Sequence, residues 1–324
     1  MKTRTLLLLT ALTLSCIQAK ADLAPTVMLH RDGVVKTYMY YEVQKAVDDA
    51  VDGDTIYLSE GTFQPFNVNK RILVRGTGYT TIIEGSCVID ISGTEKLTMP
   101  VLDALTFTGD IEVNSAYKQF TLRKCSMVNL IFNEGKYYDV KIDRCNISNR
   151  LNLPNDVVEF NAFNSRIYTL YPHNYTGQAM FEHCNIGNLL APITGGVFNS
   201  CALGHCTKLS DTTSKINLIG CVINSCFYNT SGHPGFDSCT TVNCKTECRG
   251  YSSSSSESSE YFQMDMRDSR WLKSDIDGTW IGAYGGQHPF NRNPEIPGVT
   301  KHEFSIDAAT RTMTVKLTVD KLDK

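Results

Sequence analysis

A similar segment recurs about every twenty residues through the middle of the chain, and Cys145 in VKIDRCNISNR marks its central position. Three residues before this position all eight copies are apolar, and two residues after it seven of the eight are apolar. The central position is held by Leu105, Cys125, Cys145, Ser165, Cys184, Cys201, Cys221 and Cys239. Similarity at a fixed period marks a repeat architecture in which each copy is one structural unit.

The content of the period selects one kind of repeat. It contains no ten-residue window with helical spacing and no LxxLxL frame, which excludes helical and leucine-rich repeats. Short alternating strands remain, and they predict an all-β β-solenoid in which each copy is one coil of two or three strands. Coils stacked about 4.8 Å apart bury an apolar column that a single coil could not bury alone.

A polar position follows the central one at a distance of four residues. It is Asn in four copies and a small or polar turn-forming residue in the others. The four are Asn129, Asn149, Asn188 and Asn243. We expect these side chains to stack at a bend of the coil and to hydrogen-bond along the stack.

Both ends of the solenoid have a predicted cover, because an exposed end would offer open strand edges and core to solvent. Near residues 41–51 the apolar positions have the spacing i, i+3, i+4, i+7, i+8 of an amphipathic helix, which we predict to cap the first coil. Beyond Pro297, residues 303–306 and 312–319 alternate around a short break and predict a β-hairpin that closes the far end. Alternatively, this hairpin offers a spare edge to another chain.

The first residues have the pattern of a secretory signal peptide: Lys2 and Arg4, an apolar run, and an A-x-A site that ends at Ala21. The domain plan is therefore a signal peptide at 1–21, a parallel β-helix domain at 22–290 and a C-terminal extension at 291–324. A competing interpretation is lipid attachment at Cys16. No later segment is long and apolar enough to span a bilayer. We expect a secreted, periplasmic or cell-surface protein.

Two stretches near the start, VQKAVDDAVDGDTIYLSEGTF and KRILVRGTGYTTIIEG, resemble the opening of the pectin-lyase-like right-handed parallel β-helix family. SDIDGTWIGAYGGQHPF resembles the closing stretch of secreted Bacteroidetes members of unknown function. The resemblance implies a single-stranded right-handed parallel β-helix with an N-terminal capping helix and a C-terminal β-hairpin cap. It is a fold-level likeness and supplies no active site.

The catalytic motifs of that family are missing from the sequence. Neither the NTD, DD and GHG set of polygalacturonases nor the arginine and calcium-binding carboxylates of pectate lyases can be read in it. The adjacent pair Asp48-Asp49 lies in the predicted capping helix, and His233 is followed by Pro rather than Gly. Strand alternation places Arg123, Lys141, Arg144 and Arg166 outward as solvated residues.

The cysteines of the repeat predict buried thiols. Stacked residues of neighbouring coils are about 4.8 Å apart, whereas a disulfide needs Cβ atoms near 3.8 Å. A disulfide among Cys239, Cys244 and Cys248 is the alternative for the last coils. Zinc is disfavoured because no CxxC or paired Cys/His spacing occurs, and no other metal or cofactor is predicted.

The net charge disfavours nucleic acid as a partner. Without Lys2, Arg4 and Lys20 the 31 basic residues become 28 against 34 acidic ones, so the balance moves from −3 to −6. This is the wrong sign for phosphate backbones.

One stretch, YTLYPHNYTG, predicts a ligand-binding loop, because Pro172 and Gly177 favour a turn and exposed tyrosines suit stacking on sugar rings. The candidate substrate-binding residues are Tyr168, Tyr171, His173 and Tyr175. The plainer interpretation is that these tyrosines pack over a corner of the coil.

Three functional hypotheses follow. The favoured one is a non-catalytic β-helix protein that binds a polysaccharide or partner protein along its side. The second is a polysaccharide lyase or glycoside hydrolase acting on an acidic polysaccharide, and the third is a structural spacer of a surface assembly.

Overall fold

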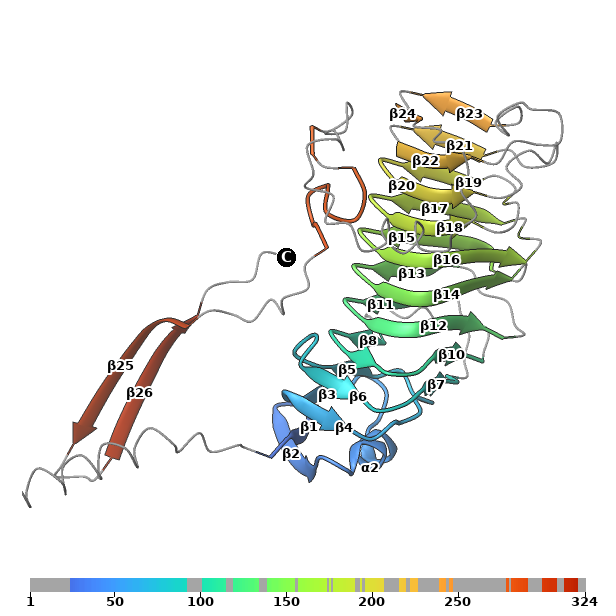
Figure 1. Cartoon of the computed structure of the whole chain (residues 1–324). Coiled ribbons are helices and arrows are strands. Elements are labelled where there is room, and N and C mark those ends of the chain that lie inside the picture. The colour runs from blue at the N-terminus through green and yellow to red at the C-terminus, as the bar shows by residue number, and fades with distance from the viewer. Residues whose placement is uncertain are drawn as a thin grey trace, which may run out of the picture.

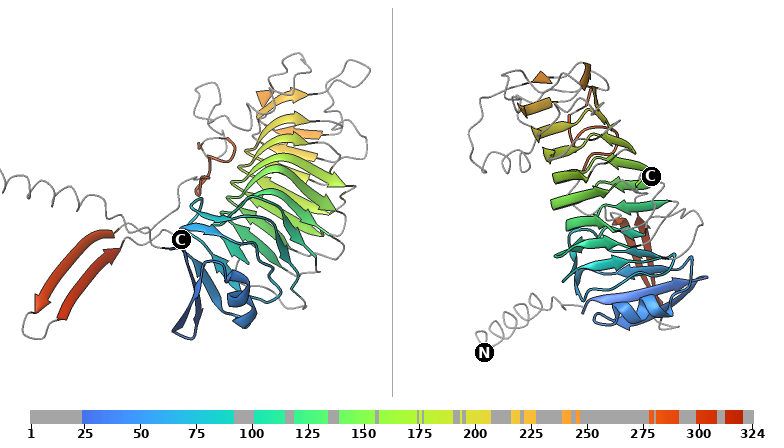
Figure 2. Two further views of the ribbon diagram at one scale, coloured as in Figure 1. Left: turned by 60° about the horizontal axis from the view of Figure 1, so that its bottom comes forward. Right: turned by 90° about the vertical axis from the view of Figure 1, so that its right-hand side faces the viewer.

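The structure is a computed structural model. It describes residues 24–91, 101–114, 119–133, 139–154, 157–173, 175, 177–189, 193, 196–206, 216–219, 222–226, 239–242, 245–246, 278–279, 281–290, 299–307 and 312–319. Two long sheets run side by side along the molecule and form a parallel β-solenoid (Figures 1 and 2). The predicted β-solenoid fold is therefore confirmed.

The first sheet, sheet A, contributes one strand to each coil. In spatial order its strands are β2 (Val34–Met39), β1 (Thr26–Arg31), β3 (Thr55–Leu58), β5 (Leu73–Arg75), β8 (Leu102–Asp103), β11 (Phe120–Arg123), β13 (Val140–Asp143), β15 (Glu159–Phe163), β17 (Gln178–Glu182), β19 (Gly196–Asn199), β21 (Ile216–Ile219) and β23 (Cys239–Val242). From β3 onward every pairing is parallel, whereas β1 pairs antiparallel with β2 and β3.

The second sheet, sheet B, follows sheet A within each coil. Its strands are β24 (Lys245–Thr246), β22 (Val222–Cys226), β20 (Ala202–Cys206), β18 (Asn185–Leu189), β16 (Arg166–His173), β14 (Asn146–Pro154), β12 (Ser126–Phe132), β9 (Thr106–Phe107), β6 (Thr81–Ile83) and β4 (Gly61–Phe63), with β7 (Cys87–Ile89) and β10 (Ile111–Val113) beside them. All of these strands pair in parallel.

The longer strands of sheet B cover two faces of the coil. The start of β12 pairs with β9 at Thr106, and its end pairs with β10 from Ile111 onward. The register of β12 against β14 shifts after Met127, which marks the bend. We call the part beyond the bend the third face; it comprises residues 111–113, 129–132, 150–154 and 169–173.

The corner between the sheets is a single residue in left-handed conformation, directly before the central position of each repeat. Its φ lies between 45° and 57° in every described copy. The residues are Ala104, Lys124, Arg144, Asn164, His183 and Ser200. One left-handed residue turns the chain sharply and points the following side chain inward, at a cost that a residue other than Gly must bear.

The inward side chain is the thiol that the repeat predicts. Cys125, Cys145, Cys184 and Cys201 are buried and in the thiol form, as is Cys87 outside this column. The thiols donate to backbone carbonyls; Cys201 Sγ, for example, lies 3.3 Å from the carbonyl oxygens of Phe181 and Asn199. Ser165 fits the same column because its hydroxyl donates to Phe163 O at 2.7 Å and accepts from the backbone N–H of Cys145 at 3.0 Å.

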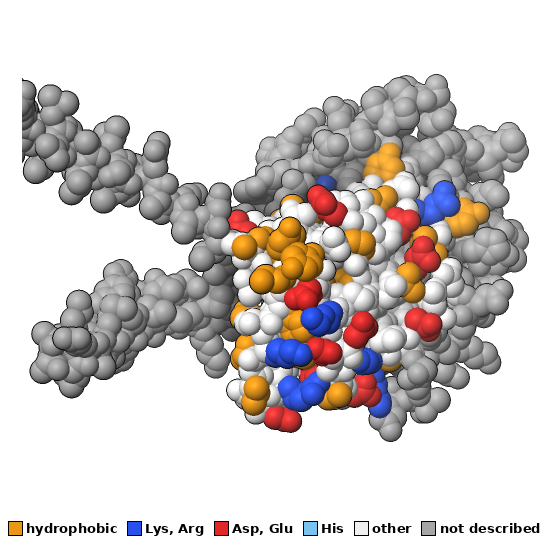
Figure 3. Space-filling model, turned by 90° about the horizontal axis from the view of Figure 1, so that it is seen from below, with side chains coloured by type: hydrophobic (Ala, Val, Ile, Leu, Met, Phe, Trp, Pro, Cys, Tyr) orange, Lys and Arg blue, Asp and Glu red, His pale blue; other side chains and the backbone are white. Residues whose placement is uncertain are grey.

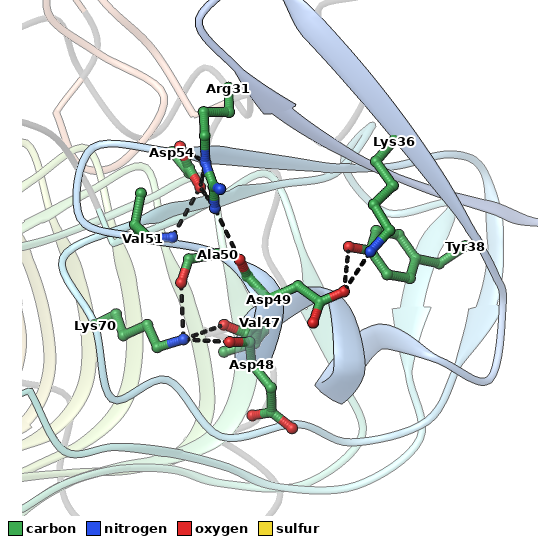
Figure 4. A network of polar contacts seen from close by, with 10 residues as sticks. All are labelled: Arg31, Lys36, Tyr38, Val47, Asp48, Asp49, Ala50, Val51, Asp54 and Lys70. Carbon is green, nitrogen blue, oxygen red and sulfur yellow. Dashed lines mark hydrogen bonds and ion pairs between the residues drawn. The ribbon is translucent and has the colours of Figure 1, made fainter.

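The cap at the start of the solenoid contains the predicted helix, as α2 (Val43–Asp49), two residues shorter at each end than expected. Its buried face consists of Val43, Ala46 and Val47. Lys70 Nζ donates to the carbonyl oxygens of Val47 and Ala50 at 3.1 and 2.7 Å and so caps the helix C-terminus (Figure 4).

The cap also contains a hairpin, β1–β2, that the sequence analysis did not predict. Its turn is Asp32-Gly33 with φ of 49° and 81°, the geometry of a two-residue type I′ turn. Two ion pairs hold the hairpin in the cap: Lys36 pairs with Asp49 of α2 at 2.6 Å, and Arg31 pairs with Asp54, directly before β3, at 2.7 Å (Figure 4).

The predicted C-terminal hairpin is present as β25 (Val299–Asp307) and β26 (Thr312–Val319), which pair antiparallel with each other. Figure 1 shows it apart from β23 and β24, so closure of the far end by this hairpin stays a prediction.

Candidate functional site: the third face and the covered corner

The structure places the four predicted site residues differently from the expected loop. Tyr168, Tyr171 and His173 belong to β16, so the expectation of turn and loop is wrong for them. The register explains this: Asn152, Leu153 and Pro154 of the coil below pair directly with residues 171–173. Pro172 is tolerated because it lies near the end of the strand.

Tyr175 is not accessible. Its side chain is fully buried, its hydroxyl donates to Gln178 O at 2.8 Å, and burial raises its pKa. For this residue the plainer interpretation, packing over a corner, fits the geometry. The structure therefore separates Tyr175 from the two half-exposed tyrosines of β16.

The third face carries a polar surface on β14 and β16. Arg150 is exposed, and its guanidinium lies 5.1 Å from the centre of the half-exposed Tyr171 ring. Asn152 is the register partner of Tyr171, and Asn149 is exposed just before Arg150. Arg150 and Asn152 were not predicted as site residues. The repeat aligns Asn149 with Asn129, but the register shift in β14 pairs Arg150 with Asn129 instead.

A row of amides borders this face, as the repeat predicts. Asn149 Nδ2 donates to Asn129 Oδ1 at 2.9 Å, and Asn129 Nδ2 donates to Asp110 Oδ1 at 2.8 Å. Higher in the stack, Asn188 Nδ2 reaches Tyr168 O at 3.4 Å instead of another Asn. The predicted hydrogen bonding along the stack is confirmed for Asn129 and Asn149, and Asn243 lies outside the described residues.

The opposite corner is covered by residues 281–290, which we call the strap. Asn164 Nδ2 donates to Gly285 O at 2.6 Å, and Asn185 Oδ1 accepts from the backbone N–H of Ala283 at 2.9 Å. The carbonyl of Ser200 accepts from the backbone N–H of Gly282 at 2.8 Å. Three consecutive coils thus hold the main chain of the strap.

The strap changes the outcome for one predicted surface residue. Arg166 was expected to be solvated, but it is 2% exposed, with its guanidinium 5.8 Å from the centre of the Phe290 ring. Lys141, by contrast, is exposed as predicted, and its ammonium group lies 4.8 Å from the centre of the Phe163 ring. Arg144 is half-buried and pairs with Asp143 at 3.1 Å.

Arg123 belongs to a charged column on the outside of sheet A. Asp103 is buried between Arg75 and Arg123, with ion-pair distances of 2.8 and 2.6 Å. Burial opposes ionisation of Asp103, but the hydrogen bonds and charges of the two arginines outweigh it and hold its pKa below the usual value. This column has a structural role.

Metal chemistry finds no support in the described part of the chain, where no three His, Cys, Asp or Glu side chains are grouped so that they could hold an ion. Asp49 of the adjacent Asp pair binds Lys36 and Tyr38 within the cap. His233, Cys244 and Cys248 lie outside the described residues, as does the side chain of Cys239.

No protein-family model matches this sequence, and no curated protein or solved structure matches it either. Among the described residues no helix has the length and apolar character needed to cross a membrane.

Proposed function

We propose that the protein is a secreted or cell-surface, non-catalytic β-helix of the pectin-lyase-like type that binds a polysaccharide along the third face. The observation that carries the proposal is the pair formed by Tyr171 and exposed Arg150 next to the amide row of Asn129 and Asn149. An aromatic ring with neighbouring hydrogen-bond donors is the combination that suits sugar rings and their hydroxyl groups.

Rigidity supports this assignment. The candidate residues lie on strands of one continuous sheet, with β14 paired to β12 and β16 along most of its length. A binding surface on paired strands loses little conformational freedom when a ligand binds. Because successive coils are about 4.8 Å apart, a long ligand that lies along the stack can contact several coils.

The test is a panel of soluble polysaccharides measured by calorimetry against the wild type and two variants, Tyr171→Ala and Arg150→Ala. We expect both substitutions to weaken binding at least about tenfold, which corresponds to 1.4 kcal/mol. Tyr57→Ala is the matched control, because Tyr57 is an exposed tyrosine on sheet A, away from the third face. Unchanged affinity in both third-face variants, or equal loss in the control, contradicts the assignment.

A further inference from the structure

Exposed apolar side chains gather on the cap. Of eight large apolar side chains that are exposed in the described part of the chain, seven lie between residues 34 and 57. They are Val34, Val35, Met39, Tyr40, Tyr41, Val51 and Tyr57. Figure 3 shows apolar side chains on this end of the molecule. A gathering of this kind marks an interaction surface more often than single exposed residues do.

Strand β2 is the outer edge of sheet A on this surface. Only Tyr38 of its six side chains is buried, so the strand is exposed on both faces. It pairs with β1 on one side, and no described strand pairs with its other side. Natural proteins normally cover, bend or charge such an edge.

The outward backbone groups of β2 can be identified. Met39 donates its N–H to Glu42 Oε2 and accepts from Glu42 N, so its groups point away from β1. Because backbone groups alternate along an antiparallel strand, those of Thr37 and Val35 also point outward. Because the groups of Met39 already bond Glu42, a further strand would bond those of Thr37 and Val35.

We infer that the β2 edge pairs antiparallel with β2 of a second copy, with Thr37 on the two-fold axis. In this register Thr37 faces Thr37, Val35 faces Met39 and Lys36 faces Tyr38 of the other copy. Val35 and Met39 thereby each meet an apolar side chain, and Thr–Thr pairs are favourable across strands.

Charge supports this register over the one that has Lys36 on the two-fold axis. That register would place Lys36 opposite Lys36, which like-charge repulsion disfavours. In the inferred register Lys36 faces an aromatic ring, the same kind of contact that it makes within its own chain at 4.8 Å from the Tyr38 ring centre. Its charge is already paired with Asp49 at 2.6 Å. The edge is therefore complementary to itself.

Sedimentation analysis of the purified protein tests this inference. We expect a concentration-dependent dimer that Val35→Lys and Thr37→Pro each weaken at least about tenfold. Thr37→Pro removes only an outward N–H, so the hairpin β1–β2 keeps its own hydrogen bonds. Val158→Lys is the matched control, because Val158 is 47% exposed and lies far from the cap in sequence and on another coil. A wild type that stays monomeric, or equal effects of Val35→Lys and Val158→Lys, overturns the inference.

A deletion variant tests whether a second copy or the C-terminal hairpin pairs with the β2 edge. Deletion of residues 291–324 is expected to leave the dimer intact. Loss of the dimer on deletion means that β25 or β26 covers the edge instead, which also overturns the inference. Circular dichroism of each variant confirms that the solenoid is folded.

Discussion

At the scale of single residues, buried polar groups in this solenoid are held by their neighbours in adjacent coils. Ser165 takes the place of a cysteine because its hydroxyl, like the thiol of Cys201, donates to a backbone carbonyl and accepts a backbone N–H. Asp103 is a second case, since the two arginines offset the cost of burying its charge.

Asp103 makes stability dependent on pH. Its folded-state pKa is lowered, so the stabilising contribution is fully present above the unfolded-state value of about 3.9 and is lost as pH falls through the folded-state pKa. We expect Asp103→Asn to lower the free energy of unfolding at pH 7 by about 2 kcal/mol, less than for a fully buried pair because both arginines are one-third exposed. Urea unfolding at pH 7 and pH 3 measures it; a difference between variant and wild type that does not shrink at pH 3 contradicts this account.

Substitutions of Tyr175 and of Tyr171 are expected to lower the stability of the protein by different amounts. Tyr175→Ala should lower the free energy of unfolding by about 3–5 kcal/mol, because it empties a fully buried site. Tyr175→Phe should cost about 1 kcal/mol through loss of the hydrogen bond to Gln178 O. Tyr171→Ala, at a half-exposed site, should stay near 0.5 kcal/mol, about the size of a surface effect. Similar losses for the two alanine variants in urea would contradict these positions.

At the scale of elements, the strap is a feature that the repeat pattern does not predict. The period predicts which side chains point inward, since alternation is local, and it predicts the Asn129–Asn149 contact correctly. It does not predict that Arg166 is buried, because the covering segment lies about 120 residues away in sequence. The β1–β2 hairpin had a usable signal in Asp32-Gly33 between apolar runs. The positions of Arg150 and Asn152 depend on a register shift that has no sequence signal.

Packing of the strap against the solenoid depends on Gly286, which lies close to His183, one of the left-handed corner residues. Gly286 has φ +73°, and a Cβ there would lie 2.8 Å from His183 Cδ2. Gly278 has φ +68° with open space around it, so both Ala substitutions bear the same backbone strain of about 1 kcal/mol. Gly286→Ala should cost a further 1–2 kcal/mol or so from overpacking. Hydrogen exchange at Gly282 and Ala283 measures it: faster exchange in Gly286→Ala than in Gly278→Ala is expected, and equal rates would contradict the contact.

At the scale of the whole molecule, stacking makes neighbouring coils depend on one another. No coil can bury its own apolar column, so each contributes to the stability of the next. The phenylalanine stack illustrates this, since Phe181 packs on Phe198 with ring centres 4.7 Å apart and planes at 5°. The thiol column is also shared by neighbouring coils. Because its thiols are buried, their reactivity reports whether the coils open.

Thiol titration without reductant is the measurement that uses this reporter. Burial raises the pKa of Cys145 to about 12 and that of Cys125 well above its ordinary value, so neither thiolate forms at pH 8 in the folded protein. We expect the five described thiols to stay unreactive until the denaturant concentration at which the circular dichroism of the sheets is lost. Mild oxidation of the folded protein should leave them intact for the same reason.

If fewer than half of the chain's cysteines react once it is fully unfolded, disulfides replace the thiol column. Reaction of these five thiols in the native protein would instead mean that the coils open individually rather than as one stack.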